Sequence, residues 1–474
     1  MIRIPLVAAP ILLGAVVATA SMPAAAQSQQ ELLDARYDRA LAAGYKALML
    51  CGAIASAERS GAGARSEASV LAYEMHGIQQ PLGDIARSLP YVVTRWPGGA
   101  QAVRHVAVDW APDMPPRIAF QRTRGGCSLG PIGMTQDAIE EAAPAAPREK
   151  IVHWHTPRPG KVTPVLEAAM GGAYGKGTRT TAVAVNWGKD GWDWRFADGF
   201  GPFTPQRTWS VAKSIAATLV GVTEHRGANA IVTRTQGAIT APPLPIFGWH
   251  RGEGDPRRAI AMDHLLRMAS GRYSDTPGNR TDALYFGGAS VDESALHWPL
   301  LHEPGSVFRY ANNDTLTAVK AIAYSFDEHP PEQFFAKAGM DDTVAETDFH
   351  GDYVLSSQVW ASTMDLIRFG QLYLNDGVLP TGERVLSEGW VTYVTTPSGP
   401  QPETGTFGYG AGFWLLNKET GVPADTFAAI GNRGQYVVIV PSRQVVIVRR
   451  GEDPAGSGFD IAGFTRDVLA RLPQ

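Results

Sequence analysis

Runs of apolar residues predict a β-hairpin at each end of the C-terminal two thirds of the chain. Residues 181–187 have the composition of a strand, the turn signal Lys-Asp-Gly follows at 189–191, and residues 192–196 return antiparallel to it. Near the C-terminus, 436–440 and 445–448 are continuous apolar runs separated by a proline-containing turn. Buried strands are therefore expected at both ends of this region.

Helical patterns lie between and after these hairpins. They cover residues 262–268 and 363–375, and an amphipathic helix over 460–472 closes the chain. Strands at both ends with helices between them predict an α+β fold. We expect one antiparallel sheet completed by both ends of the domain, flanked by helices, with an inserted helical subdomain.

A smaller unit precedes this domain. Residues 29–50 predict a helix, and 103–108 and 117–120 predict strands. The apolar positions that fall near one face of the helix are Leu32, Leu33, Tyr37, Leu41 and Tyr45. We expect a small leading α/β unit over 27–133, a Pro/Ala-rich linker over 134–164 and the main domain over 165–474.

The first 26 residues have the pattern of a secretory signal peptide. Arg3 is followed by an apolar run over 4–20 and by three alanines at 24–26. Cleavage after Ala26 would leave Gln27 at the new N-terminus, which carries no thiol for lipid attachment. We expect a periplasmic or secreted protein without a membrane anchor after cleavage.

Charge and composition narrow the possible partners. The 474 residues carry a formal net charge of −4, which gives no electrostatic reason to expect nucleic-acid binding. Apolar side chains make up 44% of the residues, enough for a large core, and no stretch after the signal peptide is long and apolar enough to span a bilayer. The sequence leaves the oligomeric state open.

The chain contains two cysteines, Cys51 and Cys127. In an oxidising compartment we expect them to form a disulfide that ties the end of the leading helix to the strands. Neither lies in a CxxC or other metal-ligand spacing. His153 and His155 could in principle share a metal, but no carboxylate or cysteine partner lies nearby in the sequence. We expect no metal and no organic cofactor.

Ser210-Val211-Ala212-Lys213 carries the most specific chemistry. It opens an apolar segment with the pattern of a buried helix. Residues three apart on a helix share a face, so the Lys213 ammonium can reach the Ser210 hydroxyl. Burial would lower the lysine pKa and let it act on the serine proton, as a serine nucleophile requires.

Two further motifs follow in order. Tyr310-Ala311-Asn312 lies a hundred residues after Ser210, and Ile430-Gly431-Asn432-Arg433-Gly434-Gln435 leads into the last hairpin. Met268-Ala269-Ser270-Gly271 lies between Ser210 and Tyr310. The order of these motifs resembles that of the serine β-lactamase/penicillin-binding-protein superfamily, and YxN resembles its class C β-lactamase branch. The third motif and Trp209 look most like the 6-aminohexanoate-dimer (nylon-oligomer) hydrolases, and the resemblance covers about residues 165–474.

The resemblance implies a role for each motif residue. Ser210 would be the nucleophile that becomes acylated, and Lys213 would hold its proton relay. Tyr310 would supply the second acid–base group; a phenol with a pKa of about 10 is a base at neutral pH only if lysine charge lowers it, so the two form one coupled unit. Asn312 would hydrogen-bond Lys213 and a substrate amide.

The oxyanion hole needs two donors. The Ser210 backbone N–H at a helix N-terminus is one, and by resemblance the Asn432 backbone N–H is the other. Gly431 and Gly434 would permit close approach of the backbone, and Gly431 would contact the substrate.

One departure from the superfamily bears on the substrate. Its β-lactamases and penicillin-binding proteins carry Lys-Thr-Gly or His-Thr-Gly at the third motif, whereas this chain has Ala429-Ile430-Gly431. Arg433 could supply a replacement cation, or be an exposed turn arginine. Without a Gly-x-Ser-x-Gly elbow, an α/β-hydrolase is disfavoured.

We therefore expect an exported serine hydrolase of β-lactamase/transpeptidase-like fold that cleaves carboxylic esters or small linear amides through an acyl-enzyme on Ser210. The alternatives are a DD-peptidase or weak β-lactamase, and a catalytically idle binding protein or sensor.

Overall fold

The computed structural model describes residues 24–61, 65–97, 102–139, 160–189, 191–227, 234–235, 238–239, 249, 254–274 and 282–473. Nearly all of the expected signal peptide lies outside this range, as do most of the expected linker and the His153 and His155 pair. Packing divides the chain into residues 1–38 and 39–474, and the description below concerns the second unit.

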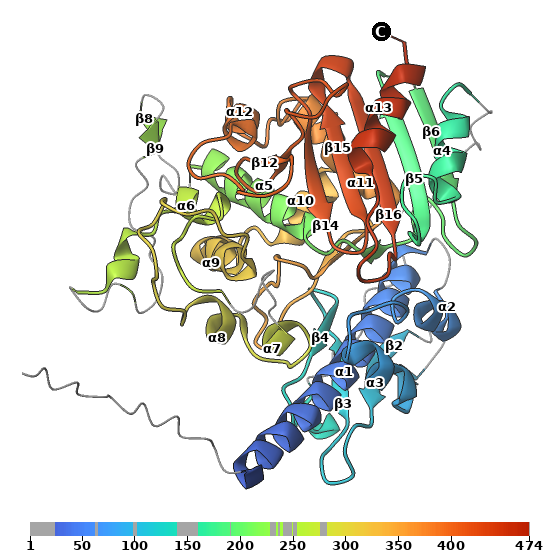
Figure 1. The fold of residues 1–474 in the computed structure, drawn as a ribbon, viewed down its shortest axis with the longest axis vertical. Coiled ribbons are helices and arrows are strands. Elements are labelled where there is room, and N and C mark those ends of the chain that lie inside the picture. Colours follow the sequence, from blue (N-terminus) through green and yellow to red (C-terminus); the bar gives the residue numbers. More distant parts are fainter. Residues whose placement is uncertain are drawn as a thin grey trace, which may run out of the picture. The chain divides into compact units, whose positions relative to one another are not determined.

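A seven-stranded antiparallel sheet forms the centre of the main domain, in the order β12-β13-β14-β15-β16-β5-β6 (Figure 1). Its strands are β5 (Thr180–Trp187), β6 (Gly191–Phe196), β12 (Gly408–Tyr409), β13 (Trp414–Leu415), β14 (Phe427–Gly431), β15 (Gln435–Val440) and β16 (Val445–Gly451). The pairing of β16 with β5 joins the last strand of the domain to its first. The predicted sheet completed by both ends of the domain is confirmed.

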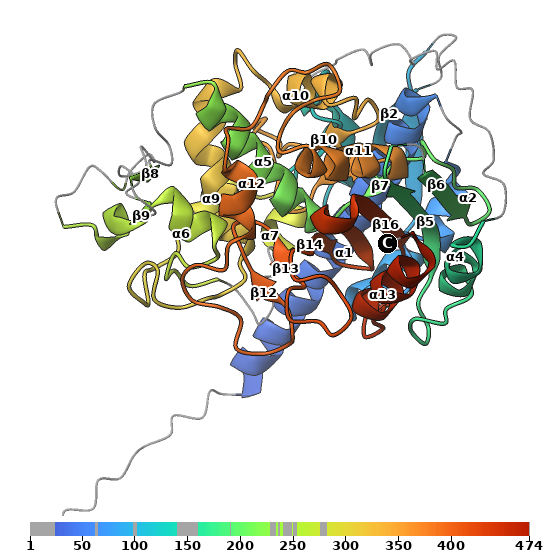
Figure 2. The same ribbon diagram turned by 90° about the horizontal axis from the view of Figure 1, so that it is seen from above.

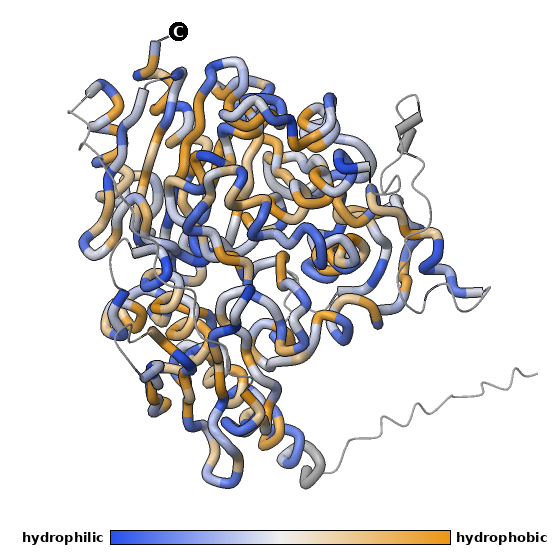
Figure 3. Tube along the Cα trace, turned by 180° about the vertical axis from the view of Figure 1, so that it is seen from behind, coloured by the Kyte–Doolittle hydropathy of each residue, from blue (hydrophilic) through white to orange (hydrophobic). Residues whose placement is uncertain are grey.

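Side chains alternate between the two faces of this sheet. On β16, Val445 and Ile447 enter one apolar core while Val446 and Val448 enter the other. A strand buried on both faces has this property because successive side chains point in opposite directions. The hydropathy view shows these strands as largely apolar segments (Figure 3).

Helices cover both faces of the seven-stranded sheet, as Figures 1 and 2 show. The helices α4 (Thr163–Met170) and α13 (Ile461–Arg471) pack on one face, and α5 (Val211–His225) and α11 (Thr363–Leu374) on the other. Every residue of α5 from Val211 to Thr223 is buried, so the helix that begins after Ser210 runs through the protein interior.

The segment between α5 and β12 forms the inserted, mainly helical part. Its helices are α6 (Met262–Leu266), α7 (Asp282–Tyr285), α8 (Val291–Ala295), α9 (Asn312–Ile322), α10 (Pro331–Lys337), α11 and α12 (Trp390–Thr395). The short strand β11 (Val359–Ala361) pairs with β10 (Val344–Ala345) on one side and with β7 (Gln206–Arg207) on the other, and β8 (Arg234–Thr235) pairs with β9 (Ala238–Ile239).

The leading unit has a four-stranded antiparallel sheet in the order β1-β2-β3-β4. Its elements are α1 (Ala24–Ser60), α2 (Glu67–Ala72), α3 (Leu82–Ser88), β1 (Tyr91–Arg95), β2 (Val103–Val108), β3 (Arg117–Gln121) and β4 (Cys127–Leu129). The expected disulfide is present: Cys51 of α1 is bonded to Cys127 of β4. The helix predicted to end at Leu50 continues to Ser60, since its buried positions extend past the disulfide.

The leading unit and the main domain share one apolar core. Arg117 of β3 also donates hydrogen bonds to the backbone carbonyls of Gly287 and Phe286, about 170 residues further along the chain. The boundaries at 133 and 165 stay a prediction, but packing is continuous across them.

The expectation that no stretch after the signal peptide is long and apolar enough to span a bilayer is wrong: by length and composition, the described part of α1, Ser28–Ser60, could cross a membrane. Its most apolar window is fully buried inside the protein. This is the property of a core helix, and Leu48, Met49 and Leu50 on α1 are indeed part of the main apolar core.

Candidate active site

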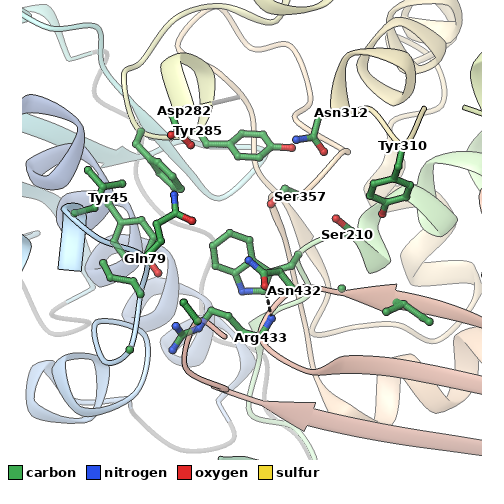
Figure 4. Close-up of a pocket in the computed structure, with 18 of the residues that line it drawn as sticks. Tyr45, Gln79, Ser210, Asp282, Tyr285, Tyr310, Asn312, Ser357, Asn432 and Arg433 are labelled. Atoms are coloured by element: carbon green, nitrogen blue, oxygen red, sulfur yellow. Dashed lines mark hydrogen bonds between the residues drawn. The ribbon is translucent and has the colours of Figure 1, made fainter. Parts of the chain in front are cut away.

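A cavity of about 450 Å³ brings the three sequence motifs together. Ser210, Tyr310, Asn312, Gly431 and Asn432 all line it. Figure 4 shows Ser210 and Tyr310 on one side of the cavity and two residues of the leading unit on the other. Residues predicted from three separate segments therefore face one space.

Ser210 stands at the N-terminus of the buried helix α5. The preceding Trp209 has φ +49°, a left-handed conformation that is strained for a residue with a side chain. On the other side of this turn lies Gly431, where a Cβ atom would collide with the Thr208 carbonyl and come within 3.0 Å of the Ser210 nitrogen. A glycine is required here, and its absence of a side chain lets the third motif approach the serine backbone.

Lys213 is buried one helical turn after Ser210, and its Nζ makes three polar contacts. It donates to Asn312 Oδ1 at 2.6 Å and to the Ser356 carbonyl at 2.9 Å. The third contact is with Ser210 Oγ at 3.1 Å. Burial lowers the pKa of Lys213 to about 7, so a large fraction is neutral near physiological pH.

Helix α9 positions Asn312, which is its first residue. The start of this helix is fixed by Asp314, which accepts a hydrogen bond from the Ser270 hydroxyl at 2.6 Å and pairs with Arg272 at 3.0 Å. All three side chains are buried. The Met268–Gly271 motif thus acts as an anchor for the helix that carries Asn312.

The ring of Tyr310 has Lys213 and two aromatic rings as neighbours. Its ring centroid is 5.3 Å from that of Trp414, 6.0 Å from that of Tyr409 and 5.0 Å from Lys213 Nζ. Burial raises the pKa of Tyr310, and its hydrogen bond with Ser210 offsets this only in part. The phenol is therefore neutral at physiological pH, and the lowering of its pKa by lysine charge, the condition for a tyrosine base, is not found.

Asn432 occupies the turn between β14 and β15 and lines the cavity with an exposed side chain. Its Oδ1 accepts a hydrogen bond from the Arg433 backbone nitrogen at 2.8 Å (Figure 4). The side chain thus braces the turn. The assignment of its backbone N–H to the oxyanion hole stays a prediction, which the proximity of the neighbouring Gly431 to Ser210 supports.

Arg433 differs from the expected exposed turn arginine. Its side chain is buried, and its Nε pairs with Glu452 at 2.7 Å. Its Nη2 donates to the backbone carbonyls of Tyr73 at 3.0 Å and His76 at 2.8 Å, both in the leading unit. The guanidinium charge is therefore balanced by a buried carboxylate.

Several lining residues lie outside the three motifs. Tyr285 lines the cavity and hydrogen-bonds Ser356 through its hydroxyl at 2.6 Å, and Trp414 is half-buried at the cavity wall. The leading unit contributes Tyr45, Gly77, Ile78, Gln79 and Leu82. Only contacts over long sequence distances bring them to the site. Within the described ranges, no group of three His, Cys, Asp or Glu residues could hold a metal ion.

Comparisons with known proteins concern the fold and the family of the chain. Among solved structures, a Bacillus anthracis protein named as a 6-aminohexanoate-dimer hydrolase matches with a TM-score of 0.52 at 18% identity, covering 65% of this chain and 83% of its own. A Mycobacterium bovis β-lactamase matches with a TM-score of 0.45 at 18% identity, covering 65% of this chain and 98% of its own. A class C β-lactamase in complex with cefoxitin has a TM-score of 0.47 at 14% identity, covering 66% of this chain and 96% of its own.

At these identities the likeness to the Bacillus anthracis protein shows the fold alone. No curated protein matches the chain. The Beta-lactamase family model matches residues 183–450, which is more than half of the 474 residues and includes Ser210, Lys213 and Tyr310. The sequence motifs, the α+β fold and this match lead to one conclusion: the chain belongs to the Beta-lactamase family and has its serine hydrolase fold.

Proposed function

We propose that this protein is a serine esterase or amidase that cleaves uncharged carboxylic esters or small linear amides through an acyl-enzyme on Ser210. The observation that carries the proposal is the environment of Lys213. Two acceptors occupy two positions around its Nζ, and the remaining contact is the Ser210 hydroxyl. A neutral amine that donates to Asn312 and Ser356 directs its lone pair toward Ser210.

In the acylation step, neutral Lys213 takes the Ser210 proton while Oγ attacks the substrate carbonyl carbon. The developing oxyanion would be held by the backbone N–H groups of Ser210 and Asn432. Tyr310, kept neutral by burial, is suited to donate its proton to the leaving oxygen or nitrogen. The proton on Lys213 then restores the phenol, and water hydrolyses the acyl-enzyme.

The walls of the cavity favour an uncharged substrate. Trp209, Phe286, Trp414 and Ile430 supply apolar surface around Ser210. The charged residues of the described lining are Arg433, whose charge Glu452 balances, and Asp282, whose carboxylate disfavours a substrate carboxylate. A β-lactam or D-Ala-D-Ala carboxylate would find no lysine at the position that carries Lys-Thr-Gly in the superfamily's β-lactamases. This supports esters and linear amides over the DD-peptidase and β-lactamase alternatives.

The test is the intact-protein mass after brief exposure to p-nitrophenyl esters and, separately, to a penicillin. We expect a transient single-acyl adduct with the esters in the wild type and none in Ser210→Ala. Ser357→Ala removes the other described serine that lines the cavity and should keep the adduct. A stable adduct without turnover would indicate a sensor. No adduct, and no nitrophenol release above that of Ser210→Ala, would reject the hydrolase.

Export to the periplasm or cell exterior is proposed on the signal-peptide pattern of the first 26 residues. It is consistent with the disulfide, which persists in oxidising compartments. The N-terminal sequence of the protein recovered from the periplasmic or extracellular fraction would test it, with Gln27 expected as the first residue.

A further inference from the structure

The leading unit reaches the cavity through one short segment. Gly77, Ile78, Gln79 and Leu82 line the same cavity as Ser210. Ile78 and Leu82 are buried, and Gln79 is half-buried. Figure 4 shows Gln79 on the side of the cavity opposite Ser210. We call residues 77–82 the wall segment.

The wall segment is held by the hairpin that carries the third motif. Arg433 Nη2 donates to the carbonyls of Tyr73 and His76, immediately before the segment. The Ala455 nitrogen, four residues after the end of β16, donates to the Gly77 carbonyl at 2.7 Å. Gly77 has φ +66°, and a Cβ there would lie 2.7 Å from Pro454. The backbone of the segment is thus fixed against two loops of the main domain.

The backbone and the side chain of Arg433 are also held in place within the main domain. Its backbone has φ +56°, its nitrogen is bound by the Asn432 side chain, and its Nε pairs with buried Glu452. A buried guanidinium that pairs with the Glu452 carboxylate and donates to the backbone carbonyls of Tyr73, His76 and Glu452 has little freedom to change position. Arg433 therefore joins the turn beside Ser210 to the wall segment.

We propose that the wall segment selects the substrate of the hydrolase and that Arg433 is the positioning residue that sets its distance from Ser210. Ile78 and Leu82 offer apolar contact, and the Gln79 carboxamide offers one donor and one acceptor group. The group recognised is uncharged, with an apolar body and one hydrogen-bonding function remote from the scissile carbonyl. This inference rests on the proposed serine hydrolase activity.

The first test uses ester pairs of equal shape. One pair consists of p-nitrophenyl 5-carbamoylpentanoate and p-nitrophenyl 6-methylheptanoate, and a second pair carries the same two end groups on the alcohol side. The readout is the ratio of kcat/KM within each pair. We call the kcat/KM of the carbamoyl ester divided by that of its methyl-branched partner the carbamoyl preference. Gln79→Leu should lower this ratio about 3- to 10-fold in one of the two pairs, which is the effect of losing one hydrogen bond. Unchanged ratios in both pairs would overturn the role of Gln79.

The matched control is Gln80→Leu. Gln80 is the next residue, is exposed and does not line the cavity. The same change in side-chain chemistry there should leave both ratios as in the wild type. An equal fall of the ratio in Gln80→Leu would mean that the segment responds to any substitution, which would also overturn the assignment.

The second test asks whether Arg433 acts through the wall segment. Arg433→Met should lower the carbamoyl preference, and Arg433→Lys should restore part of it. In a Gln79→Leu background, Arg433→Met should cause no further loss of preference, because the element it positions is already missing. Additive losses would overturn the positioning role. The Ser210 acyl adduct, measured by mass in every variant, separates failure of this inference from failure of the hydrolase itself.

Discussion

Two buried lysines, one in the leading unit and one in the main domain, differ in the groups around them, and we propose a catalytic role for only one of the two. Lys46 of α1 and Lys213 of α5 are both 2% exposed, and burial lowers the pKa of each. Lys46 donates to the backbone carbonyls of Ala86 at 3.0 Å and Leu89 at 2.7 Å, at the end of α3. Its Nζ lies 4.7 Å from the Tyr91 ring centroid.

Lys213 has the same burial but different neighbours. Its contacts include a hydroxyl that opens onto a cavity, whereas the described contacts of Lys46 are carbonyls and an aromatic ring. Both carbonyls can only accept a hydrogen bond, so Lys46 can bind them and has no proton to receive from them. Burial lowers the pKa of an amine and so makes it able to accept a proton, but only a neighbouring hydroxyl supplies a proton for it to accept.

The largest effect is expected from Lys213→Met. Removing the base from the serine should lower kcat/KM for a p-nitrophenyl ester by about 10³-fold or more, because a nucleophile and its base act as a unit. Steady-state hydrolysis checks this, and circular dichroism checks that the variant is folded. Retention of wild-type kcat/KM would remove Lys213 from the mechanism.

Reduction of the Cys51–Cys127 disulfide should act on stability and leave the chemistry in place. The bond closes a loop with a sequence separation of 76 residues. For a loop of this size the chain-entropy model gives a loss of about 4 kcal/mol in the free energy of unfolding. Thermal unfolding with and without reductant measures the loss, and Ser210 should still be acylated below the lowered Tm. Free thiols in the unfolded, unreduced protein would contradict the pairing.

Lys46→Met is the counterpart of Lys213→Met and should give the opposite result. It leaves the Ala86 and Leu89 carbonyls without this donor, which should cost about 1–3 kcal/mol of stability. Per folded molecule, kcat/KM should fall far less than in Lys213→Met. Denaturant unfolding and active-site titration separate the two quantities. A fall in kcat/KM as large as that in Lys213→Met would show that activity depends on Lys46 as much as on Lys213.

The pH dependence should identify Lys213 as the titrating group. Because its pKa is lowered to about 7, kcat/KM should rise about tenfold per pH unit below 7 and level off above it. Tyr310, whose pKa is raised, should remain protonated across this range. The profile should be the same in Lys46→Met. A rate that falls between pH 6 and 8 would contradict a neutral lysine base.

The same shift has a consequence for stability. The pKa of Lys213 in the folded protein lies below its ordinary value of 10.5, so between about pH 7 and 10.5 the unfolded chain binds the additional proton. The contribution of Lys213 to stability therefore rises with pH through this window. Lys213→Met should lack that part of the pH dependence of unfolding.

The sequence by itself determined the parts that depend on short-range geometry. Ser210 and Lys213 lie three residues apart on one helix, so their contact follows from helical periodicity. The alternation on β16 and the apolar runs of β5 and β15 likewise predict a buried sheet. The ordered motifs indicated the family.

Only the tertiary structure decided the protonation state of Lys213 and the position of the wall segment. Burial lowers the pKa of Lys213, and the acceptors that hold its Nζ, Asn312 and Ser356, are 99 and 143 residues away in the sequence. The contact of Arg433 with Tyr73 spans 360 residues. Desolvation and such contacts depend on how distant segments pack, and no local pattern encodes that packing.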